Sequence, residues 1–152
     1  MSEQDAMEAA RRWMAEHVDR YLNDPANAEM WDSSLGGGKG MLPTLLLTTT
    51  GRKSGEPRHS PLLYQAAGDG FVIIGSKGGA PAHPAWYVNL LADPNAEIRV
   101  GAKALKVKAR TAAGEERARL WAAMAEAYPP FNAYQVNAGS REIPVVVLDP
   151  IV

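Results

Sequence analysis

Two apolar runs separated by a short basic turn constrain the fold of this chain more than any other feature. The runs cover residues 42–50 and 60–67, and the sequence between them reads GRKSGEPRH. Glycines and a proline between two such runs are typical of a connection between antiparallel strands. The turn carries one acid, Glu56, beside four basic side chains, Arg52, Lys53, Arg58 and His59. Because the whole chain has a formal net charge of -1 at pH 7, this concentration of positive charge is local and suggests an anionic partner.

The remaining patterns extend this antiparallel arrangement. The sequence GDG at 68–70 predicts a hairpin turn into the run 71–76, and the runs 96–100 and 104–111 flank a turn at Gly101. A last apolar run covers 143–148, while helical spacing marks 4–22, 85–91 and 115–127. This order predicts a mainly β fold of the α+β class: a barrel of about six mostly antiparallel strands with helices outside. A doubly wound sheet would need helices between most strands.

The organisation of the chain follows from these elements. Residues 1–40 are expected to form an N-terminal amphipathic helix and a flexible glycine-rich loop, SSLGGGKG, and residues 41–152 the barrel, within a single domain. The loop is not a Walker phosphate loop, because Gly40 follows Lys39 where Ser or Thr is needed. The helix is expected to pack on its own barrel or on a partner. Contact with a membrane surface is the alternative, although acids outnumber arginines in the helix.

Composition excludes several classes of function. With no cysteine, the chain has no disulfides, thiolate nucleophiles or zinc sites with sulfur ligands, and its three histidines are too scattered to predict a metal site. A near-neutral charge argues against nucleic-acid binding. No apolar run reaches the roughly 18 residues that span a bilayer, and no secretory signal is recognised, so a cytoplasmic location is expected. Glu142, next to Arg141, is expected to serve a structural ion pair.

Two further clusters suggest a ligand site. Glycines at 75, 78 and 79 surround Lys77 just before a helix, and such a loop can offer backbone N–H groups to an anion. Together with the basic turn, it predicts a site for a phosphate or a polyanionic tail; the alternative is that the turn is only a solvated surface. Three aromatic residues around a Pro-Pro pair form either core packing or a lip over a flat ring: Tyr128, Phe131 and Tyr134.

Four motifs carry a resemblance to a known family: TTTGRKSGEPR, SPLLY, GSKGGAPAHPAWYVNLLADP and SREIPVVVLDP. In this order they resemble the deazaflavin (F420)-dependent nitroreductases, which include F420H2-dependent quinone reductases. The resemblance spans about residues 45–149 and implies a split β-barrel of the FMN-binding-like type. It also implies an oxidoreductase that transfers a hydride from reduced coenzyme F420 to a quinone, nitro-aromatic or activated enone. Two alternatives stay open: an F420-binding protein without turnover, and a reductase that uses FMN.

The resemblance implies a role for individual residues. The cofactor would contact Arg52, Lys53, Arg58, Pro61, Leu62, Ser76, Lys77, Gly78, Trp86, Tyr87 and Asn89. The acceptor would lie against Tyr128, Phe131 and Tyr134, with Tyr134 or Ser76 as the catalytic hydrogen-bond donor. Family members often have tyrosine where this chain has Phe131. A small-molecule acceptor is the expected partner, and a homodimer is also expected because related split barrels often pair. A quinone acceptor would give the N-terminal helix a reason to touch a membrane.

Overall fold

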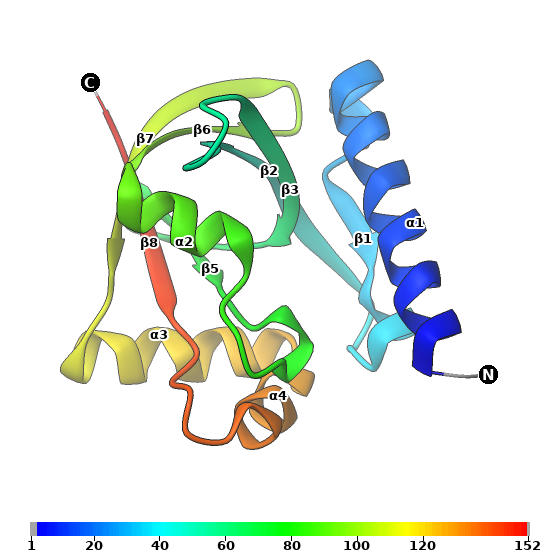
Figure 1. Cartoon of the computed structure of the whole chain (residues 1–152), viewed down its shortest axis with the longest axis vertical. Coiled ribbons are helices and arrows are strands. Elements are labelled where there is room, and N and C mark those ends of the chain that lie inside the picture. The colour runs from blue at the N-terminus through cyan, green and yellow to red at the C-terminus, as the bar shows by residue number, and fades with distance from the viewer. Residues whose placement is uncertain (1–2, 152) are drawn as a thin grey trace.

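The computed structural model describes residues 3–151, with side chains other than those of residues 3, 4, 6, 7, 10, 35 and 36 (Figure 1). The helices of this part of the chain are α1 (Glu3–Asn23), α2 (Ala85–Ala92), α3 (Gly114–Ala127) and α4 (Pro130–Ala138), with short 3-10 turns η1 (Pro25–Asn27), η2 (Ser33–Gly36) and η3 (Lys77–Gly79). Its strands are β1 (Met30–Asp32), β2 (Met41–Thr50), β3 (Pro57–Leu63), β4 (Gln65–Ala67), β5 (Gly70–Ile74), β6 (Asn95–Val100), β7 (Lys103–Thr111) and β8 (Val145–Pro150).

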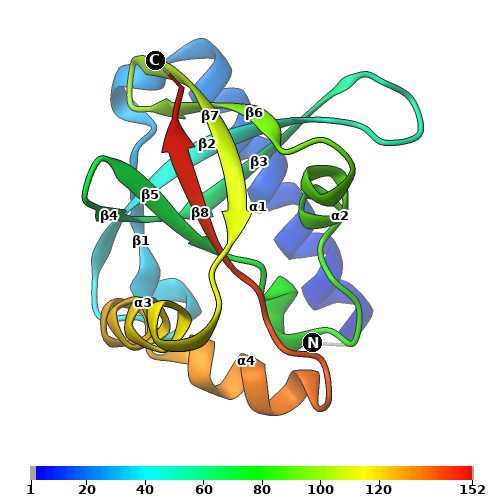
Figure 2. The same ribbon diagram turned by 90° about the vertical axis from the view of Figure 1, so that its left-hand side faces the viewer.

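The strands form one curled antiparallel sheet (Figures 1 and 2). Its order is β1-β2-β6-β7-β8-β5-β4, and β3 pairs with β2 beside this path. The predicted mainly β fold is confirmed, and the six predicted strands are present. The predicted strand 60–67 is divided at Tyr64 into β3 and β4, and the three-residue strand β1 is additional, which gives eight strands in the described residues. Since β1 pairs with β2, the N-terminal segment 1–40 contributes to the sheet.

Alternation along the strands separates two clusters of buried side chains. Leu45 and Leu47 of β2 point into the barrel, where they pack with Ile73, Ile98 and Val107. The opposite face of β5 and β8 packs against α3 and α4, which lie together at one end of the barrel (Figure 1). This second cluster contains Val72, Val147, Met124, Tyr128 and Phe131. Helix α4 therefore belongs to the core, although the sequence predicted only a break at Pro129-Pro130.

Helix α1 packs on the outer face of β2 and β3 through buried aromatic and polar groups. Tyr21 is fully buried beside Leu46, and its hydroxyl donates to the backbone carbonyl of Thr44 at 2.5 Å. His17 is 2% exposed, and its Nε2 lies 2.9 Å from the carbonyl oxygen of Ala28, to which it donates. His17 and Tyr21 of α1 thus form hydrogen bonds with backbone carbonyls of the same chain. This supports packing on the barrel and leaves the membrane contact without support.

The predicted loop SSLGGGKG is anchored to the protein at Ser33 and Gly38, whereas Ser34, Gly37 and Lys39 are exposed. Ser33 is buried, and its hydroxyl donates to the carbonyl of Gly40. A Cβ atom on Gly38 would lie 2.7 Å from the Cβ of Ser33 and 2.9 Å from Cδ1 of Tyr128. Glycine is required here because the backbone approaches the aromatic cluster so closely. None of the helices described for residues 3–151 is long and apolar enough to cross a membrane.

The burial of His17 makes the docking of α1 dependent on pH. Burial lowers the pKa of His17 below its ordinary value of 6.5, so the unfolded chain binds more protons than the folded chain as the pH falls through 6.5. The free energy of unfolding should therefore decrease below pH 6.5. We expect His17→Gln, which keeps an N–H donor for Ala28 but cannot titrate, to show a shallower decrease in urea titrations between pH 5 and 8.

Tyr21→Phe provides the control for this measurement. It removes the hydrogen bond to Thr44 and should lower the stability by about 1 kcal/mol at every pH in this range, because a typical hydrogen bond contributes about that much. Its dependence on pH should match that of the parent. An unchanged dependence on pH in His17→Gln would contradict the role given to His17.

Candidate functional site

The basic turn connects β2 to β3 and extends away from the sheet on the side of α2 (Figure 2). Its backbone is closed by two hydrogen bonds: Gly51 N–H donates to the carbonyl of Glu56, and Gly55 N–H donates to the carbonyl of Gly51, both at 2.8 Å. Gly55 has a φ of +73°, which favours glycine. The turn is therefore a defined structure that holds its basic side chains near the start of α2.

A cavity of about 220 Å³ lies between this turn and α2. Asn89 of α2 joins the two elements: its Oδ1 accepts hydrogen bonds from the backbone N–H of Arg52 at 3.2 Å and from Nη1 of Arg52 at 2.9 Å. Its Nδ2 donates to Oγ1 of Thr49 at 3.2 Å, and Asn89 is 3% exposed. We call this the cationic cavity; it is lined by Gly51, Arg52, Lys53, Ser54, Arg58, Ser60, Ala85, Trp86 and Asn89.

The positive charge of this cavity is not neutralised by the protein. Within residues 3–151, no carboxylate forms an ion pair with Arg52, Lys53 or Arg58. All three side chains are exposed at the rim, so their charges are available to a ligand that approaches from solvent. Basic groups that converge on a concave surface without acidic partners favour the binding of an anion.

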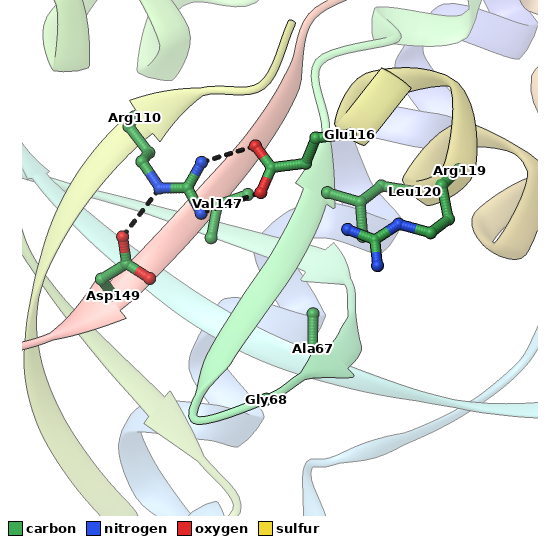
Figure 3. A pocket seen from close by; sticks show the side chains of 8 residues that line it. All are labelled: Ala67, Gly68, Arg110, Glu116, Arg119, Leu120, Val147 and Asp149. Carbon is green, nitrogen blue, oxygen red and sulfur yellow. Dashed lines mark hydrogen bonds and ion pairs between the residues drawn. The ribbon is translucent and has the colours of Figure 1, made fainter. Parts of the chain in front are cut away.

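A second cavity, of about 270 Å³, is lined by two arginines and two carboxylates, so its charges balance (Figure 3). The guanidinium of Arg110 binds both carboxylate oxygens of Glu116, at 2.6 and 3.1 Å, and its Nε donates to Asp149 at 3.0 Å. The hydrogen bonds from Arg110 also lower the pKa of Glu116 below its ordinary value. Arg119 also lines this cavity, so two arginines stand against two carboxylates. The balanced charge gives this cavity less reason to bind an anion, although it is larger than the cationic cavity. The cationic cavity is the better candidate.

The glycine loop, residues 75–80, lies beside α4. Lys77 has a φ of +47° and is the only described non-glycine residue with a positive φ. The left-handed conformation costs a residue with a side chain roughly 1–2 kcal/mol, so the surrounding structure must hold Lys77 in place. Gly79 has a φ of +85°, and a Cβ atom there would lie 2.6 Å from the carbonyl oxygen of Tyr134. The loop therefore packs directly on the backbone of α4.

Arg141 holds this loop, and sequence reasoning missed its role. It donates to the carbonyl oxygens of Gly75, Ser76 and Ala80, at 3.0, 2.7 and 2.9 Å. Its Nη1 also lies 3.1 Å from Nδ1 of His83. The ion pair expected for Glu142 forms with Arg117, at 3.3 Å between Nε and Oε1. The only signal in the sequence was the position of Arg141 inside the motif SREIPVVVLDP.

The three aromatic residues of the predicted acceptor site differ in exposure. Tyr128 and Phe131 are each 5% exposed and pack in the second core cluster, whereas Tyr134 is half-buried. The hydroxyl groups of Tyr128 and Tyr134 are 3.3 Å apart, and burial raises the pKa of Tyr128. Of the two alternatives that the sequence left open, core packing describes Tyr128 and Phe131. Tyr134 is the member that can meet a ligand.

The strand register separates the predicted residues of β3. Pro61 lies opposite Leu46, whose side chain packs against α1, so Pro61 shares that outer face. Ser60 and Leu62 share the other face, where Ser60 lines the cationic cavity and Leu62 packs on the barrel cluster. The structure therefore does not bring Pro61 to the cavity and places Ser60 there instead.

The two aromatic residues at the start of α2 also point to different places. Trp86 lines the cationic cavity and is 7% exposed. The hydroxyl of Tyr87 lies 2.9 Å from Oγ1 of Thr111, at the end of β7, so Tyr87 supports the barrel. Five of the predicted residues therefore line the cavity: Arg52, Lys53, Arg58, Trp86 and Asn89. Ser76, Lys77 and Gly78 lie in the glycine loop, which packs beside α4 and does not line this cavity. Among the described residues, no group of three His, Cys, Asp or Glu side chains could hold a metal ion.

Comparison with known proteins identifies the family. The family model described as F420H(2)-dependent quinone reductase matches residues 14–150 of this chain. The chain belongs to this family. An F420H(2)-dependent quinone reductase of Mycobacterium tuberculosis is 37% identical over 147 residues, which cover 90% of this chain and 95% of the relative. The predictions of an oxidoreductase and of F420 as its cofactor are confirmed at the level of this quinone reductase family.

Solved structures support the same assignment to the F420H2-dependent quinone reductases. An F420-H2 dependent reductase (FDR-A) is 42% identical and has a TM-score of 0.65; the match covers 70% of this chain and 94% of that chain. A second structure, described as a domain-swapped dimer, is 35% identical with a TM-score of 0.67, and covers 92% of this chain and 99% of its own. The predicted split barrel is thereby confirmed.

Two glycine substitutions test the packing of the glycine loop on α4. Gly55 and Gly79 both have a positive φ, but a Cβ atom meets nothing within 4 Å at Gly55 and meets the carbonyl of Tyr134 at Gly79. We expect Gly55→Ala to lower the free energy of unfolding by about 1 kcal/mol, the cost of the left-handed conformation. Gly79→Ala should lower the free energy of unfolding by at least about 2–3 kcal/mol, because the overlap of the new Cβ atom with the carbonyl of Tyr134 adds to that cost. Equal losses in urea titrations would contradict the contact.

Proposed function

We propose that this chain is an F420H2-dependent quinone reductase that holds the anionic tail of its cofactor in the cationic cavity. The observation that carries the proposal is the set of three basic side chains without acidic partners around a cavity of about 220 Å³. The phosphate and oligoglutamate tail of F420 needs several positive charges, and Arg52, Lys53 and Arg58 supply them. Asn89 fixes the direction of the Arg52 guanidinium before any ligand arrives.

Trp86 and the glycine loop would orient the bound cofactor. Trp86 would provide an apolar wall next to the cationic side chains, and the glycine loop would approach the phosphate or the deazaflavin with its backbone. When bound, reduced F420 supplies a hydride from C5 of its ring to the acceptor. The chain itself would supply position and a hydrogen-bond donor, so that no protein nucleophile is needed.

Tyr134 is the preferred donor to the acceptor oxygen. It is half-buried on α4 next to the glycine loop, and its hydroxyl lies 3.3 Å from that of Tyr128. Because burial raises the pKa of Tyr128, that phenol stays protonated and can hydrogen-bond to Tyr134. A donor held in this way stabilises negative charge that develops on a quinone oxygen. Ser76 is the second candidate donor.

The structure of a relative supports a further proposal about assembly. A solved chain that is 35% identical over 92% of this chain is described as a domain-swapped dimer. In this chain α1 packs on β3 and is joined to the sheet through the short segment around Pro25. A terminal helix that docks on the barrel across such a connection is an element that two copies could exchange. We therefore propose a homodimer.

Affinity for F420 tests the role of the basic turn. Removing an exposed cation, in Lys53→Ala or Arg58→Ala, should weaken binding by about two- to fivefold, because exposed ion pairs contribute about 0–1 kcal/mol each. Each change should also reduce the dependence of the dissociation constant on salt. The measurement is a fluorescence titration with F420 at two salt concentrations. Lys103→Ala, which removes an exposed cation from β7, is the control and should bind like the parent.

Turnover tests the quinone reductase itself. Oxidation of F420H2 with menadione should be catalysed by the parent and slowed about 10- to 100-fold in Tyr134→Phe, because the acceptor oxygen loses its donor. Tyr64→Phe is the matched control, since it removes a hydroxyl that donates to Glu29 at 2.7 Å elsewhere in the barrel. Tight binding of F420 without turnover of any acceptor would favour a binding protein. A purified protein with a flavin spectrum would favour FMN.

A further inference from the structure

The backbone of the glycine loop is turned toward one side chain. The guanidinium of Arg141 donates hydrogen bonds to the carbonyl oxygens of Gly75, Ser76 and Ala80 at 2.7–3.0 Å. A guanidinium has five N–H donors in one plane, so it can serve three carbonyls at once, whereas an ammonium group has no such fixed geometry. Arg141 therefore determines the orientation of several peptide planes in this loop.

The orientation of the carbonyls determines where the neighbouring N–H groups point. In a trans peptide the C=O and N–H bonds point in opposite directions. The carbonyls of Gly75 and Ser76 point to Arg141, so the N–H groups of Ser76 and Lys77 point to the other side of the loop. Lys77 and Gly78 are exposed on the surface, and the positive φ values of both residues continue this turn of the backbone. Two amide dipoles and one ammonium group thus belong to a single short segment.

The backbone around Arg141 is held by Gln135 of α4. Gln135 donates from Nε2 to the carbonyl of Arg141 at 2.8 Å, and its Oε1 accepts from the N–H of Ile143 at 2.9 Å. Gln135 follows Tyr134 directly in α4. His83 completes the surroundings of the guanidinium: its Nδ1 accepts a hydrogen bond from Arg141, which fixes His83 as the neutral tautomer with a proton on Nε2.

We propose that Arg141 is a positioning residue for cofactor binding, which aims the amide N–H groups of Ser76 and Lys77 at the anionic or carbonyl oxygens of F420. This inference rests on the proposed function. Arg141 does not touch the ligand in this scheme; it acts through the loop. Arg141 also links the loop to the helix that carries Tyr134, because its guanidinium binds the loop while its backbone carbonyl accepts a hydrogen bond from Gln135 of α4.

The experiment compares Arg141→Ala and Arg141→Lys with a matched control, Arg117→Ala. Arg117 also donates to a backbone carbonyl, that of Ile143 at 2.7 Å, but this partner lies outside the glycine loop. Three readouts are recorded for each variant: amide NMR shifts of residues 75–80 without ligand, the dissociation constant for F420, and the urea midpoint. Arg141→Ala is also titrated with millimolar methylguanidinium, which can replace the missing group.

We expect Arg141→Ala to shift the loop amides and to weaken F420 binding by about tenfold or more, since hydrogen bonds to a charged group are among the stronger ones. Methylguanidinium should restore part of the affinity, and Arg141→Lys should remain weak because charge alone does not orient three carbonyls. Arg117→Ala should lower the urea midpoint and leave the affinity unchanged. This pattern would separate positioning from a general loss of stability.

Two results would overturn the inference. If Arg141→Ala binds F420 within about twofold of the parent, or if Arg117→Ala weakens binding as much as Arg141→Ala does, the loop is not positioned by Arg141 for the cofactor. If the parent chain itself does not bind F420, the proposed function fails and the inference fails with it. The parent titration is measured first, so these two failures are distinguishable.

Discussion

The burial of β2 on both of its faces is the constraint on which the rest of the structure depends. Leu45 and Leu47 point into the barrel, while Leu46 on the opposite face packs beneath Tyr21 of α1. The same strand pairs with β1, β3 and β6, so its backbone joins the N-terminal segment to the barrel. Its end leads directly into the basic turn. The turn can present unneutralised charge to solvent because the strand that carries it is fixed on both faces.

Short-range signals made most of the fold predictable. The alternation in β7 and the turn residues around Gly101 depend on neighbours in sequence, and the structure has the expected hairpin between β6 and β7. Strand β1 could not be predicted because three residues carry no periodicity, and only pairing with β2 makes them a strand. Helix α4 was not predicted because a Pro-Pro pair such as Pro129-Pro130 is also typical of a break after a helix. A proline at the first turn is also a common way to begin a helix, and the spacing of Phe131 and Tyr134 was compatible with one.

In the candidate site, too, features within one short segment could be predicted from the sequence, whereas contacts between distant segments could not. The cationic residues could be found from sequence because they lie within one turn. The contact between Arg52 and Asn89 crosses 37 positions, and those of Arg141 with the glycine loop cross more than 60, so no spacing rule reveals them. The face of the sheet on which Pro61 lies depends on the register between β2 and β3, and the sequence alone did not determine that register. Position in a motif therefore does not determine the direction in which a side chain points.

The arginines fall into two groups: those whose guanidinium groups bind other groups of the protein, and those that are available to a ligand. Arg110 is neutralised by two carboxylates, and the guanidinium of Arg141 is occupied by backbone carbonyls and His83. In contrast, Arg58 lies at the rim of the cationic cavity without an ion pair among the described residues. The donors of the part-buried Arg141 need partners because unpaired donors are costly away from water, whereas the exposed guanidinium of Arg58 stays hydrated until an anion binds. Because Arg141 and Gln135 tie the glycine loop to α4, substitutions in these two elements should not act additively.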